Sequence, residues 1–186
     1  MRHKYATRAL VLARSPLGEA NALLTLLTRE VGIVRARAQS VRRSGAKLSA
    51  ALATFSESDV VLVRGREGWR LSGAVLGEAH FRALREAARA IAVRFVGLVV
   101  RLAPSDTPEP ALFALVEQAF IALAHAPPTQ YDAIECLAAL RLLALLGFDA
   151  GAIPEGGFSD DALAEVAAHR RAFIARVNRG IEASGL

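Results

Sequence analysis

The chain has 186 residues, of which 53% are hydrophobic, and its 23 basic side chains outnumber its 18 acidic ones, for a formal net charge of +5. This much apolar material supports one large or two small packed cores and excludes an intrinsically disordered chain. The single cysteine, Cys136, excludes an internal disulfide and favours a reducing compartment, and the apolar segments are too often interrupted by charge to span a membrane.

The first 78 residues are predicted to form short β-strands separated by turns. Apolar and β-branched residues gather in five runs, which are residues 5–14, 22–28, 33–38, 60–64 and 69–75. A four-residue hairpin loop, Gly65-Arg66-Glu67-Gly68, joins the last two runs, and residues 49–53 have room for one or two helical turns. Five short strands in so few residues are typical of a closed barrel, and the commonest such barrel is the OB-fold.

Alternation of apolar and polar residues predicts which strand faces are buried. The third run carries on one face Val34, Ala36 and Ala38, and on the other Ile33, Arg35 and Arg37. The fifth run carries on one face Trp69, Leu71 and Val75, and on the other Arg70 and Ser72. We expect the first-named face of each run to line the core.

Beyond residue 78 the apolar residues follow a helical period, and four helices are predicted. The first covers residues 81–102 and ends before Pro104. Thr107 is predicted to cap the second helix, with a proline at its first position, and the helix extends to residue 126.

The third and fourth helices have recognisable start and stop signals. Thr129 and Asp132 form a predicted capping box, and Gly147 ends that helix. Ser159, followed by two aspartates, caps the last helix. The sequence therefore predicts an α+β chain of two domains. These are a five-stranded OB-fold β-barrel at residues 1–78 and an all-α helical bundle at residues 79–186.

The two predicted domains differ in charge. Residues 1–80 hold 13 Lys and Arg against 6 Asp and Glu, whereas residues 81–186 hold 10 against 12. A basic part beside a slightly acidic one suggests a polyanion as the partner of the first and a protein as the partner of the second. The alternative is that the basic side chains only keep a surface hydrated.

Seven basic residues of the barrel are the candidate nucleic-acid contacts. They are Arg35, Arg37, Arg42, Arg43, Lys47, Arg64 and Arg66. Several cations along one surface suit a phosphate backbone, because each guanidinium can donate two hydrogen bonds to one phosphate. Aromatic residues are scarce, and Phe55 and Trp69 are predicted to be core residues rather than base-stacking platforms. Binding should therefore be electrostatic and indifferent to sequence.

Three residues of the helical part are candidate contacts for an acidic tail of a partner protein. They are Arg82, Arg85 and Arg141. Arg82, Arg85 and Arg89 lie at spacings of three and four, on one stripe of the predicted first helix. Arg141 interrupts an apolar run, so it either emerges at a groove that receives the tail or pairs with a buried acid. A hydrated helix face is the alternative for the stripe.

No catalytic residue and no metal or cofactor site is predicted. The four histidines lie far apart, without an acid or a cysteine at ligand or triad spacing. No glycine-rich phosphate loop follows a strand, which argues against a nucleotide hydrolase. Cys136 is predicted to be a small core residue. We therefore expect a binding protein rather than an enzyme.

An ordered set of short motifs resembles one known family. Residues 27–32 read LTREVG, and a basic loop, Phe55 and the Gly65-Arg66 hairpin follow in order. Residues 140–148 read LRLLALLGF, which resembles a leucine-rich segment that ends in glycine and an aromatic residue. In this order the motifs resemble the RecO family of bacterial recombination mediators, well over the first 78 residues and loosely beyond them.

The chain departs from the family pattern at several points. Many members carry a four-cysteine zinc module after the glycine-aromatic pair, where residues 149–158 here hold neither cysteine nor histidine. Ser40 stands in place of a usual glycine, and Ala139 in place of a common glutamate. The chain is thus similar to a short member that lacks the zinc module.

The resemblance implies a protein that binds single- and double-stranded DNA and promotes annealing. It implies as partners the acidic tail of single-stranded DNA-binding protein and RecR, with an indirect action on RecA loading in the RecF pathway of DNA repair and recombination. A cytoplasmic, nucleoid-associated protein is expected, since no signal-peptide core follows the basic N-terminus. The basic barrel equally suits an RNA- or ribosome-associated factor, and a pure protein-interaction adaptor is the third interpretation.

Overall fold

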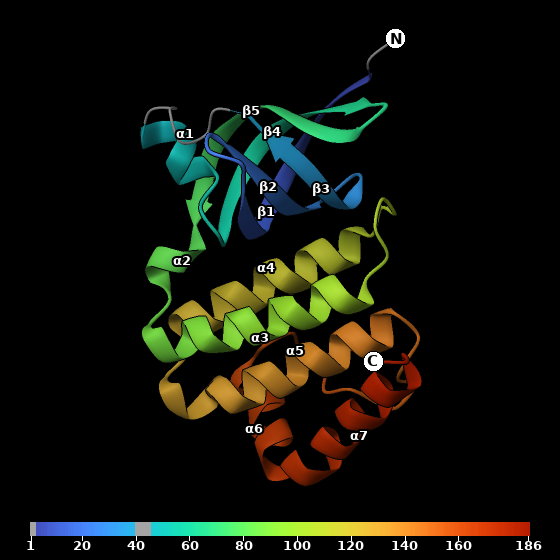
Figure 1. The fold of residues 1–186 in the computed structure, drawn as a ribbon. Coiled ribbons are helices and arrows are strands. Elements are labelled where there is room, and N and C mark those ends of the chain that lie inside the picture. Colours follow the sequence, from blue (N-terminus) through green and yellow to red (C-terminus); the bar gives the residue numbers. More distant parts are fainter. Residues whose placement is uncertain (1–2, 40–45) are drawn as a thin grey trace. The chain divides into compact units, whose positions relative to one another are not determined.

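A computed structural model of the chain describes residues 3–39 and 46–186, which form two compact units (Figure 1). The units are Met1–Ala83 with Pro104–Phe113, and Leu84–Ala103 with Ala114–Leu186. Each unit is therefore built from two separate stretches of chain. No helix among the described residues is long and apolar enough to cross a membrane.

Five strands form most of the first unit. They are β1 (His3–Leu17), β2 (Asn21–Thr28), β3 (Gly32–Ala38), β4 (Ser56–Gly65) and β5 (Gly68–Ala79). The strands close into a barrel in the order β1-β2-β3-β5-β4, in which β3 and β5 pair in parallel and the other neighbours antiparallel. The helix α1 (Ala46–Ala51) follows β3, near the predicted helical turns. This is the arrangement of an OB-fold, so the predicted five-stranded barrel is confirmed.

The strand β3 alternates as the sequence predicts over most of its length. Its inward residues are Val34, Ala36 and Ala38, and its exposed residues are Arg35 and Arg37. The inward residues pack with apolar side chains of the other strands into one core cluster. Phe55 is also buried, with 2% of its surface exposed, as predicted.

Ile33 lies on the same face of β3 as the arginines, as the alternation predicts, but it is buried because a later segment covers it. This segment, residues 104–109, follows α3 (Glu86–Leu102) and is called the strap below. Ser105 forms an isolated parallel bridge with Ile33, and the Asp106 backbone N–H donates to the Ile33 carbonyl at 2.9 Å. Ile33 is therefore 3% exposed.

Gly32 allows the strap to approach the barrel closely. Its φ is +80°, and a Cβ at this position would lie 1.9 Å from the Thr107 carbonyl oxygen. A larger residue would displace the strap. The prediction that Thr107 caps a helix is wrong, because Thr107 belongs to the strap and α4 (Pro110–His125) begins only at Pro110.

A β-bulge changes the predicted alternation along β5. Val61 pairs with Gly73 and Leu62 pairs with Leu71, so Ser72 is an extra residue on its strand. The side chains beyond the bulge therefore exchange faces, and Val75 is 69% exposed instead of buried. The hairpin before β5 is also tighter than predicted, because Gly65 pairs with Gly68 and leaves a two-residue turn.

Helices build the second unit, as predicted. Besides α3 and most of α4, they are α5 (Tyr131–Leu145), α6 (Asp160–Ala168) and α7 (Arg170–Ala183), with a short 3-10 helix, η1 (Pro128–Gln130), before α5. The helix α5 packs against α3, α6 and α7, and most of its length is buried. It is thus the central helix of this unit.

Two predicted helices are interrupted in the structure. The first is divided into α2 (His80–Ala83) and α3, because Arg85 has extended backbone angles, φ −69° and ψ 161°. The last is divided into α6 and α7 at His169, whose φ of −109° and ψ of 24° are not helical. Neither break is marked by glycine or proline.

The predicted helix caps are partly confirmed. The Ser159 hydroxyl oxygen accepts a hydrogen bond from the Ala162 N–H, and Gly147 ends α5 with φ +81°. The capping box at Thr129 is wrong, because Thr129 lies inside η1 and Gln130 precedes α5 without a side-chain cap.

Candidate nucleic-acid interface

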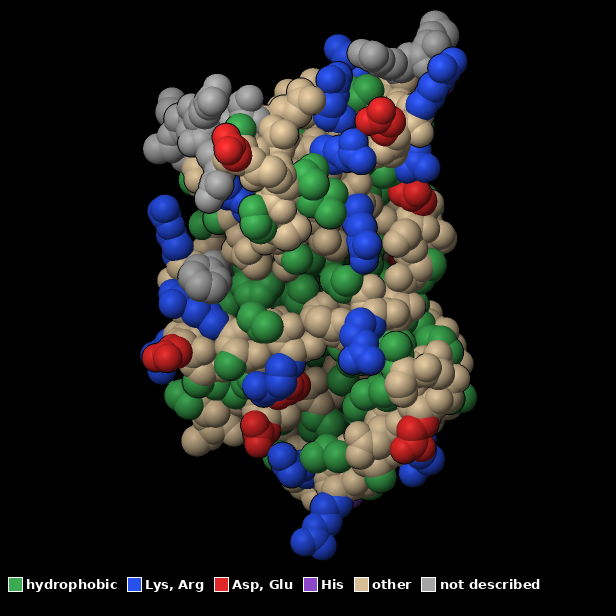
Figure 2. Space-filling model, in the orientation of Figure 1, with side chains coloured by type: hydrophobic (Ala, Val, Ile, Leu, Met, Phe, Trp, Pro, Cys, Tyr) green, Lys and Arg blue, Asp and Glu red, His purple; other side chains and the backbone are tan. Residues whose placement is uncertain are grey.

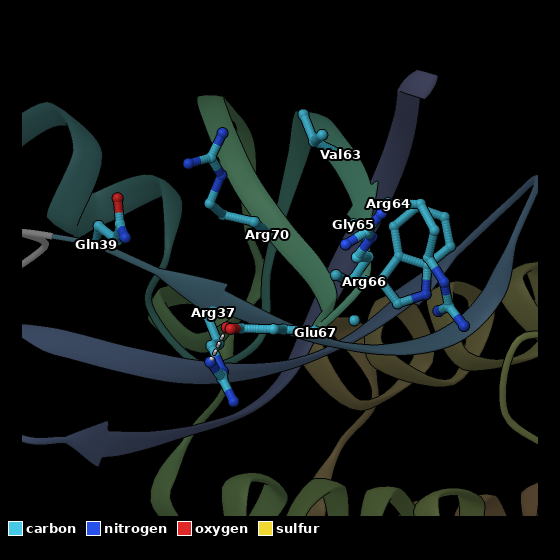
Figure 3. A pocket seen from close by; sticks show the side chains of 10 residues that line it. Arg37, Gln39, Val63, Arg64, Gly65, Arg66, Glu67 and Arg70 are labelled. Carbon is cyan, nitrogen blue, oxygen red and sulfur yellow. Dashed lines mark hydrogen bonds and ion pairs between the residues drawn. The ribbon is translucent and has the colours of Figure 1, made fainter. Parts of the chain in front are cut away.

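An open pocket of about 790 Å³ lies on the barrel beside the β4–β5 hairpin (Figure 3). Its lining includes four arginines, Arg37, Arg64, Arg66 and Arg70, and the pocket is called the arginine pocket below. One acidic residue, Glu67, lines it as well. Figure 2 shows further basic side chains over the visible face of the barrel, with few acidic ones among them.

Strand register brings two of these arginines together. Arg37 of β3 is the parallel partner of Arg70 of β5, and both are exposed. The preceding pair, Ala36 and Trp69, is buried. Since side chains alternate along paired strands, the two arginines emerge side by side on the outer face of the barrel.

The hairpin supplies the other two arginines and the glutamate. Arg64 is the last residue but one of β4, and Arg66 occupies the turn before β5. The Arg37 guanidinium pairs with the Glu67 carboxylate at 3.1 Å, with 54% and 84% of the two side chains exposed. An ion pair this exposed contributes about 0–1 kcal/mol, so a phosphate can readily replace the carboxylate.

The Trp69 ring is fixed within the barrel wall rather than free on its surface. It is 7% exposed, and its indole N–H donates to an Asp106 carboxylate oxygen at 2.6 Å. The Arg64 guanidinium lies 4.9 Å from the ring centroid, and the Tyr5 ring meets Trp69 edge-on at 5.2 Å. The prediction that Trp69 is a core residue is thus confirmed.

A smaller pocket of about 320 Å³ lies in the second unit and is called the helical pocket below. Its apolar lining comes from α3, α5 and α7 and includes Phe95, Leu98, Ile174, Val177 and Ile181. Two arginines and the two acidic residues with which they pair, Asp132 and Glu135, line it as well. Arg94 forms a two-pronged pair with the Glu135 carboxylate, 2.6 Å for each contact, and Arg170 lies 3.3 Å from Asp132. The hydrogen bonds with Glu135 raise the pKa of Arg94.

The first 78 residues of the chain match a known protein family. The family model described as "Recombination protein O N terminal" matches residues 1–78. These residues include all five strands, except for Ala79 at the end of β5. The chain belongs to the RecO family.

Curated RecO proteins support this assignment beyond the barrel. The chain is 32% identical to the "DNA repair protein RecO" of Dehalococcoides mccartyi over 116 residues, covering 61% of this chain and 46% of that protein. It is 35% identical to RecO of Synechococcus elongatus over 117 residues, covering 62% and 44%. The match to RecO of Acaryochloris marina is 32% identical over 148 residues, covering 79% and 50%. The chain spans about half the length of the curated relatives it matches.

The structure of this RecO barrel brings three of the seven predicted DNA contacts into one pocket, namely Arg37, Arg64 and Arg66. Arg35 is exposed on the same face of β3 but outside the pocket lining. Arg42 and Arg43 lie outside the described residues, as does the side chain of Lys47.

Arg70 is the pocket residue that sequence analysis does not identify. Its outward orientation follows from alternation with Trp69, which the sequence shows. Its proximity to Arg37 depends on the parallel pairing of β3 with β5, which is set by barrel closure. Local sequence carries no signal for that pairing.

The predicted arginine stripe of the helical part does not lie on one helix. Arg82 belongs to α2, and Arg85 is the residue before α3, in extended conformation. The helical spacing on which the stripe was predicted therefore does not apply across the break.

Among the described residues, Arg141 neither pairs with an acid nor lies at an open groove. Its guanidinium donates to the carbonyl oxygens of Pro154 and Gly157 at 2.9 and 2.8 Å and lies 5.2 Å from the Phe158 ring centroid. Burial lowers the pKa of Arg141. This arginine fastens the loop that follows α5.

Proposed function

We propose that this RecO-family chain binds DNA through the arginine pocket and acts as a mediator and annealing protein in DNA repair and recombination. The observation that carries the proposal is the juxtaposition of four arginines from β3, β4, β5 and the hairpin turn. Guanidinium groups spaced along one surface neutralise successive phosphates and release counterions. In the full proposal, the protein works with RecR to load RecA onto DNA coated by single-stranded DNA-binding protein.

The pocket supports recognition of the backbone rather than of bases. Phe55 and Trp69 are buried, so neither offers an open ring face on which a base can stack. Contacts to phosphate carry no sequence information. We therefore expect single- and double-stranded DNA of any sequence to bind.

The test is the salt dependence of DNA affinity. Single-stranded DNA should lose affinity with a log–log slope of about −0.7 per neutralised phosphate. Replacing Arg37, Arg66 and Arg70 together by alanine should make the slope shallower by roughly 2, because up to three contacts are lost. Melting temperature should hardly change, since these side chains are exposed.

A matched control removes the same charge elsewhere. Arg29, Arg101 and Arg171 are exposed and lie outside the lining of the arginine pocket, and their triple alanine variant should keep the wild-type slope. An equal change in both variants would mean that only net charge matters. Tighter binding of RNA than of DNA in direct competition would favour the RNA- or ribosome-associated factor instead.

We further propose that the helical pocket receives the acidic tail of single-stranded DNA-binding protein. Such a tail ends in an apolar side chain and a carboxylate. The apolar lining suits the side chain, and Arg94 and Arg170 suit the carboxylate, which would replace Glu135 or Asp132 on a guanidinium. Arg82 and Arg85 stay candidate contacts outside this pocket. Arg141 is a weaker candidate, because the loop after α5 already occupies part of its guanidinium.

A charge-reversal pair separates these sites. Arg170→Glu should weaken binding of a peptide copy of the tail several-fold, because a cation of the pocket lining is replaced by an anion. The neighbouring Arg171→Glu changes the same charge outside the pocket lining and should bind normally. If a variant with Arg82 and Arg85 both changed to Glu loses the peptide while Arg170→Glu keeps it, the tail binds near α2 and not in the helical pocket.

A further inference from the structure

The strap brings a carboxylate to the edge of the arginine pocket. One Asp106 oxygen accepts from the Trp69 indole N–H at 2.6 Å, and the other lies 3.0 Å from an Arg64 guanidinium nitrogen. The Asp106 backbone N–H is held by the Ile33 carbonyl at 2.9 Å. Its φ of +58° is in the left-handed region, where aspartate and asparagine are tolerated better than most residues.

The two acidic residues near the pocket differ in how firmly they are placed. Glu67 is 84% exposed at a hairpin turn, and its described contact is with Arg37. Asp106 is 44% exposed and is fixed by Trp69, by Arg64 and by its own backbone. Contacts with the barrel therefore fix the position of the Asp106 carboxylate, whereas the Glu67 side chain is held less firmly.

We propose that Asp106 is an internal phosphate mimic, which holds Arg64 over the Trp69 ring until a DNA phosphate replaces it on the guanidinium. The inference rests on the proposed function of the arginine pocket. Carboxylate and phosphate oxygens accept the same hydrogen bonds from a guanidinium. Because one Asp106 oxygen stays bound to Trp69, the other can release Arg64 without movement of the strap.

The exchange has a measurable effect on ion release. When a phosphate binds the Arg64 guanidinium in place of Asp106, the freed Asp106 carboxylate attracts a cation from solution. This uptake offsets one of the counterions that DNA releases on binding. The wild-type chain should therefore bind DNA more weakly, and with a shallower salt slope, than a chain in which Asp106 has no charge.

The test uses Asp106→Asn in the full chain. Asparagine keeps the size and an oxygen that can accept from Trp69, but it carries no charge. Single-stranded DNA should bind several-fold more tightly at low salt, with a log–log slope steeper by about 0.7. Glu78→Gln is the matched control, because Glu78 is exposed on β5 outside the pocket lining, and its slope should equal that of the wild type.

Trp69 is the chain's single tryptophan, so its emission reports on the strap contact in the free protein. The spectrum of Asp106→Asn should match that of the wild type, whereas Asp106→Ala should shift it. A changed spectrum in Asp106→Asn together with tighter binding would overturn the exchange, because the gain would then come from release of the strap.

The outcomes distinguish the inference from the proposed function. A wild-type chain that shows salt-dependent DNA binding, with Asp106→Asn unchanged or equal to Glu78→Gln, overturns the mimic alone. A wild-type chain without salt-dependent DNA binding overturns both.

Discussion

Trp69 lies between the edge of the Tyr5 ring and the Arg64 guanidinium, with its indole N–H bonded to Asp106. Its ring belongs to the core cluster of the barrel, while its polar edge faces the strap. One side chain thus contributes both apolar burial and the placement of an arginine. Packing and hydrogen bonding at this residue can be separated by two substitutions.

Trp69→Ala should lower the free energy of unfolding by about 3–5 kcal/mol, because it leaves a large cavity. Trp69→Phe keeps most of the ring and loses the hydrogen bond to Asp106, which should cost about 1–2 kcal/mol. Urea unfolding followed by circular dichroism measures both. A Trp69→Ala chain of nearly normal stability that has lost DNA affinity would identify the ring as a stacking platform instead.

The pocket residues that have a local signal in the sequence can be predicted from it. Arg37 follows from alternation on β3, and Arg64 and Arg66 follow from the predicted hairpin in which they lie. Arg70 and Asp106 are missed, because each reaches the site through contacts between segments far apart in the chain. Asp106 in particular lies in a connection between helices, where no barrel residue is expected.

Two arginines hold the loop after α5 in place. Arg176 of α7 contacts both Asp149 carboxylate oxygens, at 2.5 and 3.2 Å, and donates to the Ala152 carbonyl at 2.6 Å. Arg141 holds the far end of the same loop at the Pro154 and Gly157 carbonyls. Charged hydrogen bonds thus fix a segment that contains neither cysteine nor histidine.

Asp149→Asn should destabilise the chain by about 2–4 kcal/mol at neutral pH, because Arg176 and Asp149 are only 17% and 10% exposed. Hydrogen bonds from Arg176 lower the pKa of Asp149, so the stabilisation is present above the unfolded pKa, about 3.9, and is lost as pH falls through the lowered value. Urea unfolding at several pH values should show the wild type and the variant converging in acid. Asp161→Asn, an exposed change in the first turn of α6, should cost less than about 1 kcal/mol. A difference that stays constant into acid would argue against the ion pair.

Helix ends are predictable where one residue determines them. Ser159 and Gly147 act through their own hydroxyl group and backbone angle, and both predictions are confirmed. The breaks at Arg85 and His169 have no such marker in the sequence. The bulge at Ser72 is also invisible locally, because it arises from the register with β4.

Charge and periodicity predict which part of the chain forms the barrel and which part forms the helices. They do not predict that a later segment returns to the barrel. The basic first part forms the barrel, and the less basic remainder forms the helices, as charge and periodicity indicate. The return of the strap to the barrel is not predictable from the sequence. It depends on the absence of a side chain at Gly32, which leaves room for the Thr107 backbone, and not on a pattern of side chains. Close backbone approach leaves no trace in hydropathy.

The strap also sets an order of events during synthesis. Residues 80–103 have to emerge from the ribosome after β5 before the strap can reach Ile33. Until then the nascent barrel presents an unpaired edge at the start of β3, and such edges readily pair with other chains. The mature barrel therefore depends on a segment translated after the residues of the first long helix, α3, and its last contact can form only after those residues have been synthesised.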